Sequence, residues 1–151
     1  NVPPGTGLLV LANDNIEVFE NEFWDNNNVN IMVYSFTLGG RTIDDPNYDP
    51  FPEQIYIYDN EYRGGGTAPR HRNLMAWHEV AQVNSPNIVW DGLVKDSVET
   101  SSIICLGPNT SASFLNLKGG ENPEDVSYDP EPHSCTIPRL QKVEFDFPGD
   151  D

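Results

Sequence analysis

The stretch Asn15-Ile-Glu-Val-Phe-Glu-Asn-Glu-Phe23 recurs, residue class for residue class, as Gln54-Ile-Tyr-Ile-Tyr-Asp-Asn-Glu-Tyr62, 39 residues later. A short apolar segment precedes each copy, at residues 8–12 and 31–35. Self-similarity of this kind is typical of proteins in which one structural unit stacks on the next. The sequence therefore predicts two stacked rungs, each a set of short strands that pairs in parallel with the next set.

The connections between these strands favour a coil of parallel strands over a sandwich of hairpins. The strands are short and are separated by Asn, Asp and Gly corners, without a two-residue Asn-Gly hairpin signal between them. The rung without its insertion is about 23 residues long, which suits one turn of a three-strand coil. The side chains expected to face the interior are Leu9, Leu11, Ile16, Val18 and Phe23 in the first rung, and Ile31, Val33, Ser35, Ile55, Ile57 and Tyr62 in the second.

Asn21 and Asn60 fall at the same corner of successive rungs. An inward amide can bond to its copy across one strand spacing of about 4.8 Å, so the pair predicts an asparagine ladder. The alternative is two unrelated surface asparagines.

The whole chain, 1–151, reads as one domain with six segments. These are the first rung and the start of the second at 1–36, a loop excursion at 37–53, the rest of the second rung at 54–66, a helical insertion at 67–86, an irregular third rung at 87–117 and a Pro-rich tail at 118–151, which is expected to drape over the surface. Within the insertion, a helix is expected over 69–83 with Thr67 as its cap.

Charge and hydropathy exclude several classes of partner. A formal net charge of −16 repels nucleic acid and anionic membranes. No apolar run reaches the roughly 18 residues that a membrane-spanning helix needs.

Stacked rungs would place acidic side chains in register, Glu20 over Asp59 and Glu22 over Glu61. At about 5 Å such pairs repel by roughly 1 kcal/mol in water, and a divalent cation would relieve the repulsion. Calcium is therefore a candidate cofactor, with a second possible site in the excursion at Asp44, Asp45 and Asp49. The alternative is a solvated acidic face without an ion.

Aromatic side chains form a second candidate surface. Phe19 and Tyr58 are expected to stack on an outward ladder with Tyr56 beside them, while Tyr48 and Trp77 are further candidates in the excursion and the helix. Such a stripe could bind sugar rings or a partner; alternatively, the excursion and the helix cover it, since a large exposed apolar patch is sticky.

Cys105 and Cys135 lack the spacing of a metal or redox motif, so the sequence predicts a disulfide and an oxidising compartment. Asn109 begins an Asn-Thr-Ser glycosylation pattern, which would matter only in a eukaryotic source. Of the three histidines, His78 is followed by Glu79 but lacks the second histidine of a metalloprotease helix.

Three sets of residues carry a family resemblance: the rungs at 7–23 and 53–62, the loop Asp45-Pro-Asn-Tyr-Asp-Pro-Phe-Pro-Glu53, and Asn87-Ile-Val-Trp-Asp-Gly92 with the two cysteine segments. Together they resemble the C-terminal part of the parallel β-helix repeat proteins, a family of bacterial exported proteins. The resemblance implies an all-β fold: a right-handed parallel β-helix with a few rungs, one short helix and an irregular C-terminal tail. It also implies a secreted, periplasmic or cell-surface location and, through neighbouring genes in the family, a c-type cytochrome as a partner.

Family members are longer, so we expect either that this chain is the C-terminal piece of a longer protein or that another chain or a second copy covers the end at residues 8–12. Two functions are compatible with these features. The first is an exported, non-catalytic binding or assembly module for glycans or a protein partner, and the second is a calcium-assisted polysaccharide lyase or glycoside hydrolase. Carboxylates at catalytic separation in a cleft would favour the enzyme.

Overall fold

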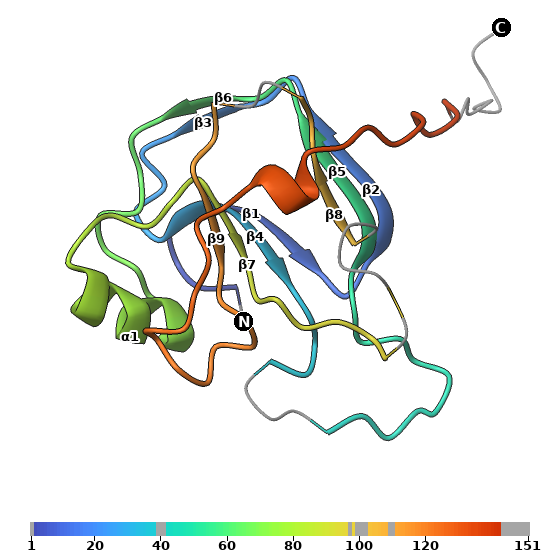
Figure 1. Cartoon of the computed structure of the whole chain (residues 1–151), viewed down its shortest axis with the longest axis horizontal. Coiled ribbons are helices and arrows are strands. Elements are labelled where there is room, and N and C mark those ends of the chain that lie inside the picture. Colours follow the sequence, from blue (N-terminus) through green and yellow to red (C-terminus); the bar gives the residue numbers. More distant parts are fainter. Residues whose placement is uncertain (1, 39–41, 97, 99–102, 109–110, 143–151) are drawn as a thin grey trace, which may run out of the picture.

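Three parallel β-sheets dominate the computed structural model, which describes residues 2–38, 42–96, 98, 103–108 and 111–142 (Figure 1). Asn109 lies outside the described residues. Sheet A contains β1 (Thr6–Leu11), β4 (Val29–Tyr34), β7 (Ile88–Trp90) and β9 (Phe114–Asn116), in that order. Sheet B contains β2 (Asp14–Phe19), β5 (Glu53–Tyr58) and β8 (Ile104–Leu106), and sheet C contains β3 (Glu22–Trp24) and β6 (Glu61–Arg63).

The chain visits sheets A, B and C in turn, and we call each circuit a pass. The first pass is β1, β2 and β3; the second is β4, β5 and β6; the third is β7 and β8; and β9 returns to sheet A. Leu8 lies opposite Ile31, and Ile16 lies opposite Ile55, in the register that the repeat predicts. A largely β fold of parallel strands is thus confirmed, with sheets that are not closed. Residues 87–117 are not a single rung, because β9 pairs with β7 and so begins a fourth pass.

Alternate side chains from all three sheets meet in an inner core. Its buried members in the strands are Val10, Val18, Phe23, Ile31, Val33, Ile55, Ile57, Ile88, Trp90, Ile104, Leu106 and Phe114. Leu8 and Ile16 pack against it from the first pass. The expectation that Leu9 and Leu11 face inward is wrong, because the continuous run Leu8-Leu-Val-Leu11 does not reveal which alternate set is inside.

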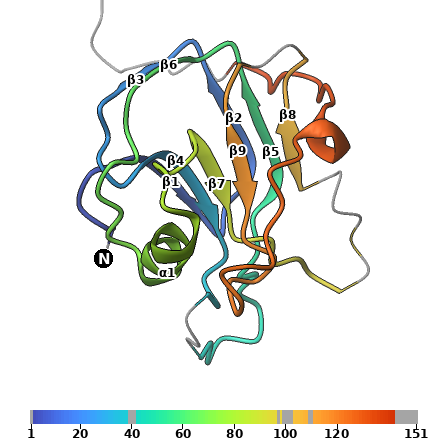
Figure 2. The same cartoon turned by 60° about the vertical axis from the view of Figure 1, so that its left-hand side comes forward.

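A second apolar cluster covers the outer face of sheet A. It contains Leu74 and Trp77 of α1 (Arg72–Ala81), and Leu9 and Leu11 pack against it. Figure 2 shows α1 beside β1 and β4, on the side away from sheet B. Both faces of sheet A are therefore covered, which is why β4 is buried at every position.

The helix is shorter than predicted and begins differently. His71 occupies the N-cap position without a side-chain bond, and α1 ends at Gln82 in the left-handed conformation. Thr67 does not cap α1; its hydroxyl instead bonds to the Asn27 side chain. The reason is that Asn28 accepts hydrogen bonds from the backbone of Arg70 and His71 and so places the first turn further along the chain.

The bend at Asn21 and Asn60 repeats from the first pass to the second, as the strands do. Asn21 donates from its backbone N–H and its Nδ2 to Asn60 Oδ1, both at 3.0 Å. Asn60 Nδ2 in turn donates to the carbonyls of Val18 and Tyr58. The predicted asparagine ladder is confirmed, and it joins six polar groups at one bend of the chain.

The segment after β9 closes the other end of the inner core instead of only draping over the surface. Ser127 pairs antiparallel with Asn116, and Ser134 pairs parallel with Leu106. Between them, the short helix η2 (Glu131–His133) inserts His133, whose ring lies 5.2 Å from Trp90 and 5.1 Å from Phe114, measured between ring centroids. The expectation of a tail that lies only on the surface missed this buried histidine.

Asn60→Ala removes the central residue of the ladder and leaves the carbonyls of Val18 and Tyr58 without this donor. We expect the free energy of unfolding to fall by about 1 to 3 kcal/mol in urea denaturation. Asn47→Ala is the matched control, because Asn47 bonds only within its exposed loop. Equal stability of the two variants would contradict a structural role for the ladder.

Candidate functional site

The first pass forms an open end of the described structure. β1, β2 and β3 are the outermost strands of sheets A, B and C, and no described residue continues the sheets beyond them. The N–H of Ala12 bonds to Tyr34 in the neighbouring strand, so by alternation the N–H groups of Gly7, Leu9 and Leu11 point away from β4. These groups constitute a sheet edge that is free within the described part of the chain.

This edge lacks the features that usually prevent strands from pairing. β1 reads Thr-Gly-Leu-Leu-Val-Leu, without a charged residue or a proline. Beside it lies a hollow of about 600 Å³, lined by Leu8, Phe23 and Trp24 together with Gly7, Asn21, Glu22 and Asn26. Trp24 is 53% exposed, and its ring lies 4.8 Å from the guanidinium of Arg63. The open end therefore combines unpaired backbone with exposed apolar surface.

The acidic side chains of successive passes have the predicted register. Glu22 lies opposite Glu61, and the N–H of Glu20 bonds to the carbonyl of Asp59. Glu61 is paired with Arg63 at 3.1 Å, a contact that offsets part of the repulsion. The described residues contain no group of three or more His, Cys, Asp or Glu side chains arranged to hold a metal, and the calcium site stays a prediction.

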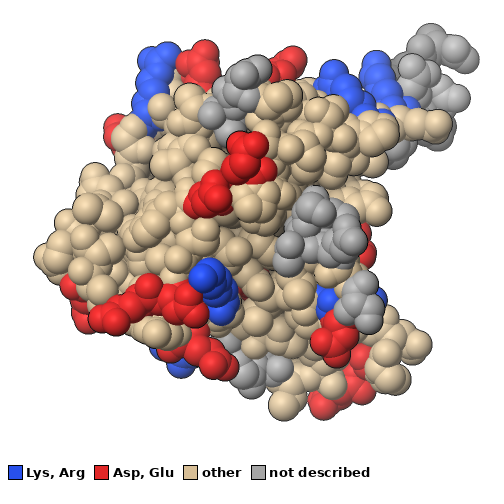
Figure 3. Space-filling model, in the orientation of Figure 1, with Lys and Arg blue, Asp and Glu red and all other residues tan. Residues whose placement is uncertain are grey.

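Acidic residues of the excursion have other partners. Asp49 lies 2.6 Å from Lys95 Nζ, and this hydrogen-bonded ion pair lowers the pKa of its carboxyl. Asp45 accepts a hydrogen bond from the N–H of Asn47, and Asp44 is exposed. Figure 3 shows that acidic side chains on one face of the molecule lie in separate groups with Lys or Arg among them.

The aromatic stripe forms as predicted on the outer face of sheet B. The rings of Phe19 and Tyr58 stack at 5.1 Å, and those of Tyr56 and Tyr58 at 4.2 Å. Tyr58 donates to Glu17, which lies opposite Tyr56 in the adjoining strand.

The C-terminal segment, and not the excursion or the helix, covers this stripe. Arg139 lies 4.4 Å from the Phe19 ring centroid and 3.8 Å from Glu17, and the N–H of Leu140 bonds to Glu17. The predicted disulfide between Cys105 and Cys135 anchors the segment, with 5.3 Å between the two Cα atoms. The helix covers sheet A instead, so the expected cover was assigned to the wrong element.

The two remaining aromatic candidates lie elsewhere. Trp77 is buried against sheet A, and its indole N–H donates to the hydroxyl of Tyr128 at 2.9 Å. Tyr48 is exposed in the excursion, where its ring meets Phe36 edge-on. The structure thus joins Phe19, Tyr56 and Tyr58 in one surface and buries Trp77 in another place.

Sequence reasoning missed a buried carboxyl at the end of β7. Asp91 is fully buried and accepts hydrogen bonds from the N–H and hydroxyl of Ser35, both at 2.7 Å, and from the N–H of Leu93. Burial raises the pKa of Asp91 to about 6, although these hydrogen bonds favour the ionised form. An Asp directly after three buried residues, at a corner, is the sequence signal that could have revealed it.

No known protein family, curated protein or solved structure matches this chain. The resemblance to parallel β-helix repeat proteins therefore rests on the sequence motifs alone. In the described residues, no helix is long and apolar enough to cross a membrane.

Asp91→Asn is expected to weaken the dependence of stability on pH. Because folding raises the pKa of Asp91, its neutral form is favoured in the native state, and the associated stability is lost as pH rises from about 4 through about 6. A shift of this size corresponds to roughly 2 to 3 kcal/mol. Chemical denaturation at pH 4 and 7 should show a smaller difference in the variant than in the native protein; an unchanged difference would contradict the assignment to Asp91.

Cys135→Ser should release the segment that covers sheet B. In the chain-entropy model, a disulfide closing a loop of about 30 residues stabilises by roughly 3 to 4 kcal/mol. We expect that loss in denaturation, together with faster amide hydrogen exchange at residues 136–142. Cys105→Ser should match it, and a segment that stays protected in both variants would show that the bonds to Glu17 suffice.

Proposed function

We propose that this protein is a non-catalytic assembly module that pairs the open end of its sheets with strands of another protein chain, a partner or a second copy. We further propose that the three sheets form a right-handed parallel β-helix. The order in which the chain visits the sheets supports this fold, since crossovers between parallel strands of one sheet are nearly always right-handed.

The observation that carries the proposal is the unprotected edge of β1. An uncharged edge strand whose outward N–H and C=O groups have no partner among the described residues is a ready template for a further strand. The opposite end is different, since Ser127 and Ser134 pair with the last strands there and His133 fills the core. This asymmetry favours pairing through the first pass alone.

Charge restricts the partner. At a net charge of −16, two copies repel each other, so self-association should strengthen as salt screens the repulsion. A neutral or basic partner would bind without that penalty. The disulfide supports a role in an oxidising compartment, which we propose is outside the cytoplasm.

Leu9→Pro tests the edge directly. Proline removes one N–H that points away from β4, and a proline at such a position is tolerated in an edge strand. In sedimentation equilibrium at rising protein concentration, we expect the native protein to associate, more strongly at high salt, and Leu9→Pro to remain monomeric.

Leu9→Ala is the matched control, because it removes the same side-chain packing but keeps the N–H. It should associate like the native protein. Association that persists in Leu9→Pro, or a native protein that remains monomeric at every concentration and salt level, would contradict pairing between copies through β1.

A further inference from the structure

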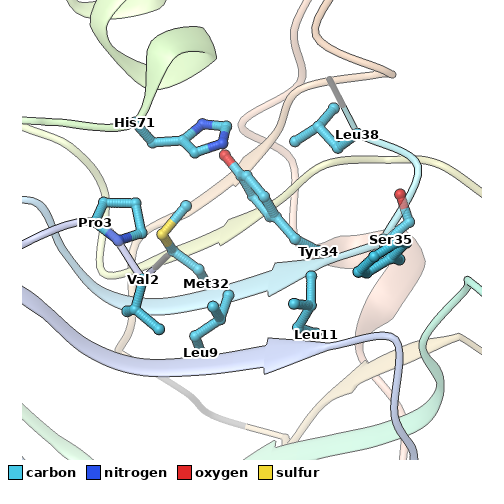
Figure 4. A pocket seen from close by; sticks show the side chains of 10 residues that line it. Val2, Pro3, Leu9, Leu11, Met32, Tyr34, Ser35, Leu38 and His71 are labelled. Atoms are coloured by element: carbon cyan, nitrogen blue, oxygen red, sulfur yellow. The ribbon is translucent and has the colours of Figure 1, made fainter. Parts of the chain in front are cut away.

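A cavity of about 210 Å³ lies on the outer face of sheet A, beside the start of α1 (Figure 4). Most of its wall is apolar, and the lining includes Val2, Pro3, Leu9, Leu11, Met32 and Leu38. Ser35, Phe36 and two polar rings complete it, Tyr34 from β4 and His71 from the residue before α1. In Figure 4 the hydroxyl end of Tyr34 points toward the His71 ring.

One buried side chain holds both walls of this cavity. Asn28 Oδ1 accepts hydrogen bonds from the N–H groups of Arg70 and His71, at 2.6 and 3.2 Å. Its Nδ2 donates to the Thr6 hydroxyl, which itself donates to the carbonyl of Pro3. The walls of the cavity are thus joined by a partly buried hydrogen-bond network centred on Asn28.

Two buried polar atoms beside the cavity are left unsatisfied by the described residues. Tyr34 is 3% exposed, and neither its hydroxyl nor His71 Nδ1 has a hydrogen-bond partner among the described residues. The two rings meet edge-on, with 4.8 Å between their centroids. Buried polar groups are nearly always paired, so an unpaired hydroxyl and an unpaired ring nitrogen at one cavity indicate a missing partner.

Both groups are uncharged at neutral pH. Burial, together with the nearby Asp91, raises the pKa of Tyr34 well above its usual value. Burial and the charge of Arg72 lower the pKa of His71. An apolar cavity with two neutral hydrogen-bonding groups disfavours a charged ligand, because desolvation of its charge would not be compensated.

We propose that this cavity binds a small uncharged molecule with an apolar ring and one hydroxyl group, for which phenol is the simplest example. The ring would occupy the aliphatic part, and the hydroxyl would bond to Tyr34 and His71. The size is suitable, since an engineered apolar cavity of about 150 Å³ binds benzene. The cavity shares Leu9 and Leu11 with the open sheet edge, but it uses their side chains on the outer face of sheet A and not their backbone N–H groups. The proposal therefore does not rest on the assembly role.

Three probes of similar shape test the proposal by calorimetry and by NMR of the full chain. Phenol should bind, toluene should bind about threefold to tenfold more weakly because it lacks the hydroxyl, and benzoate should not bind. Tyr34→Phe should weaken phenol binding by the same factor while leaving toluene binding unchanged. Tyr62→Phe is the matched control, since it removes another buried tyrosine hydroxyl away from the cavity.

The proposal is overturned if none of the probes shifts the NMR signals of Leu9, Leu11 or His71, since a bound water would then suffice as the missing partner. It is also overturned if phenol and toluene bind equally, or if Tyr34→Phe and Tyr62→Phe weaken phenol binding to the same extent. Leu11→Trp, which fills the cavity, should abolish phenol binding in a folded protein.

Discussion

Parallel pairing of β2 with β5 and of β3 with β6 places the strand residues of the first copy of the repeat opposite their counterparts in the second. This register brings Asn21 to Asn60, Phe19 to Tyr58 and Phe23 to Tyr62, so corner, outer face and inner core all stack together. A shift by one residue would turn every core side chain outward. The rest of the structure therefore depends on this single register.

Stacking also determines how the ends of the molecule differ. Each pass satisfies the strand edges of the pass before it, but the first and last passes have a neighbour on one side only. At the last pass, the C-terminal segment supplies the missing bonds through Ser127 and Ser134, and His133 packs on Trp90. At the first pass, β1 has no such cover among the described residues. The difference is the physical basis of the proposed assembly role.

Sheet A differs from the other sheets because α1 covers its outer face. That second apolar layer buries Met32, Val89 and Leu115 and leaves the cavity at Tyr34 and His71 beside the start of α1. Sheet B is covered instead by the segment at Arg139, held by the disulfide and by Glu17. The outer faces of sheets A and B thus have different covers, although their strand sequences look alike. An apolar helix covers sheet A, and an extended, partly ionic segment covers sheet B.

The repeat alone predicts the strand pairing, the register, the asparagine ladder and the aromatic stripe, because these depend on local periodicity and on residues that recur at constant spacing. The disulfide could be anticipated because Cys105 and Cys135 had no competing motif. The orientation of Leu9 and Leu11 could not, because a strand that is apolar at consecutive positions has no alternation to reveal its inner face. Nor could the burial of His133 or the pairing of Asn28 with residues 70 and 71. Those contacts join segments that share no repeat, so they exist only after the whole chain has packed.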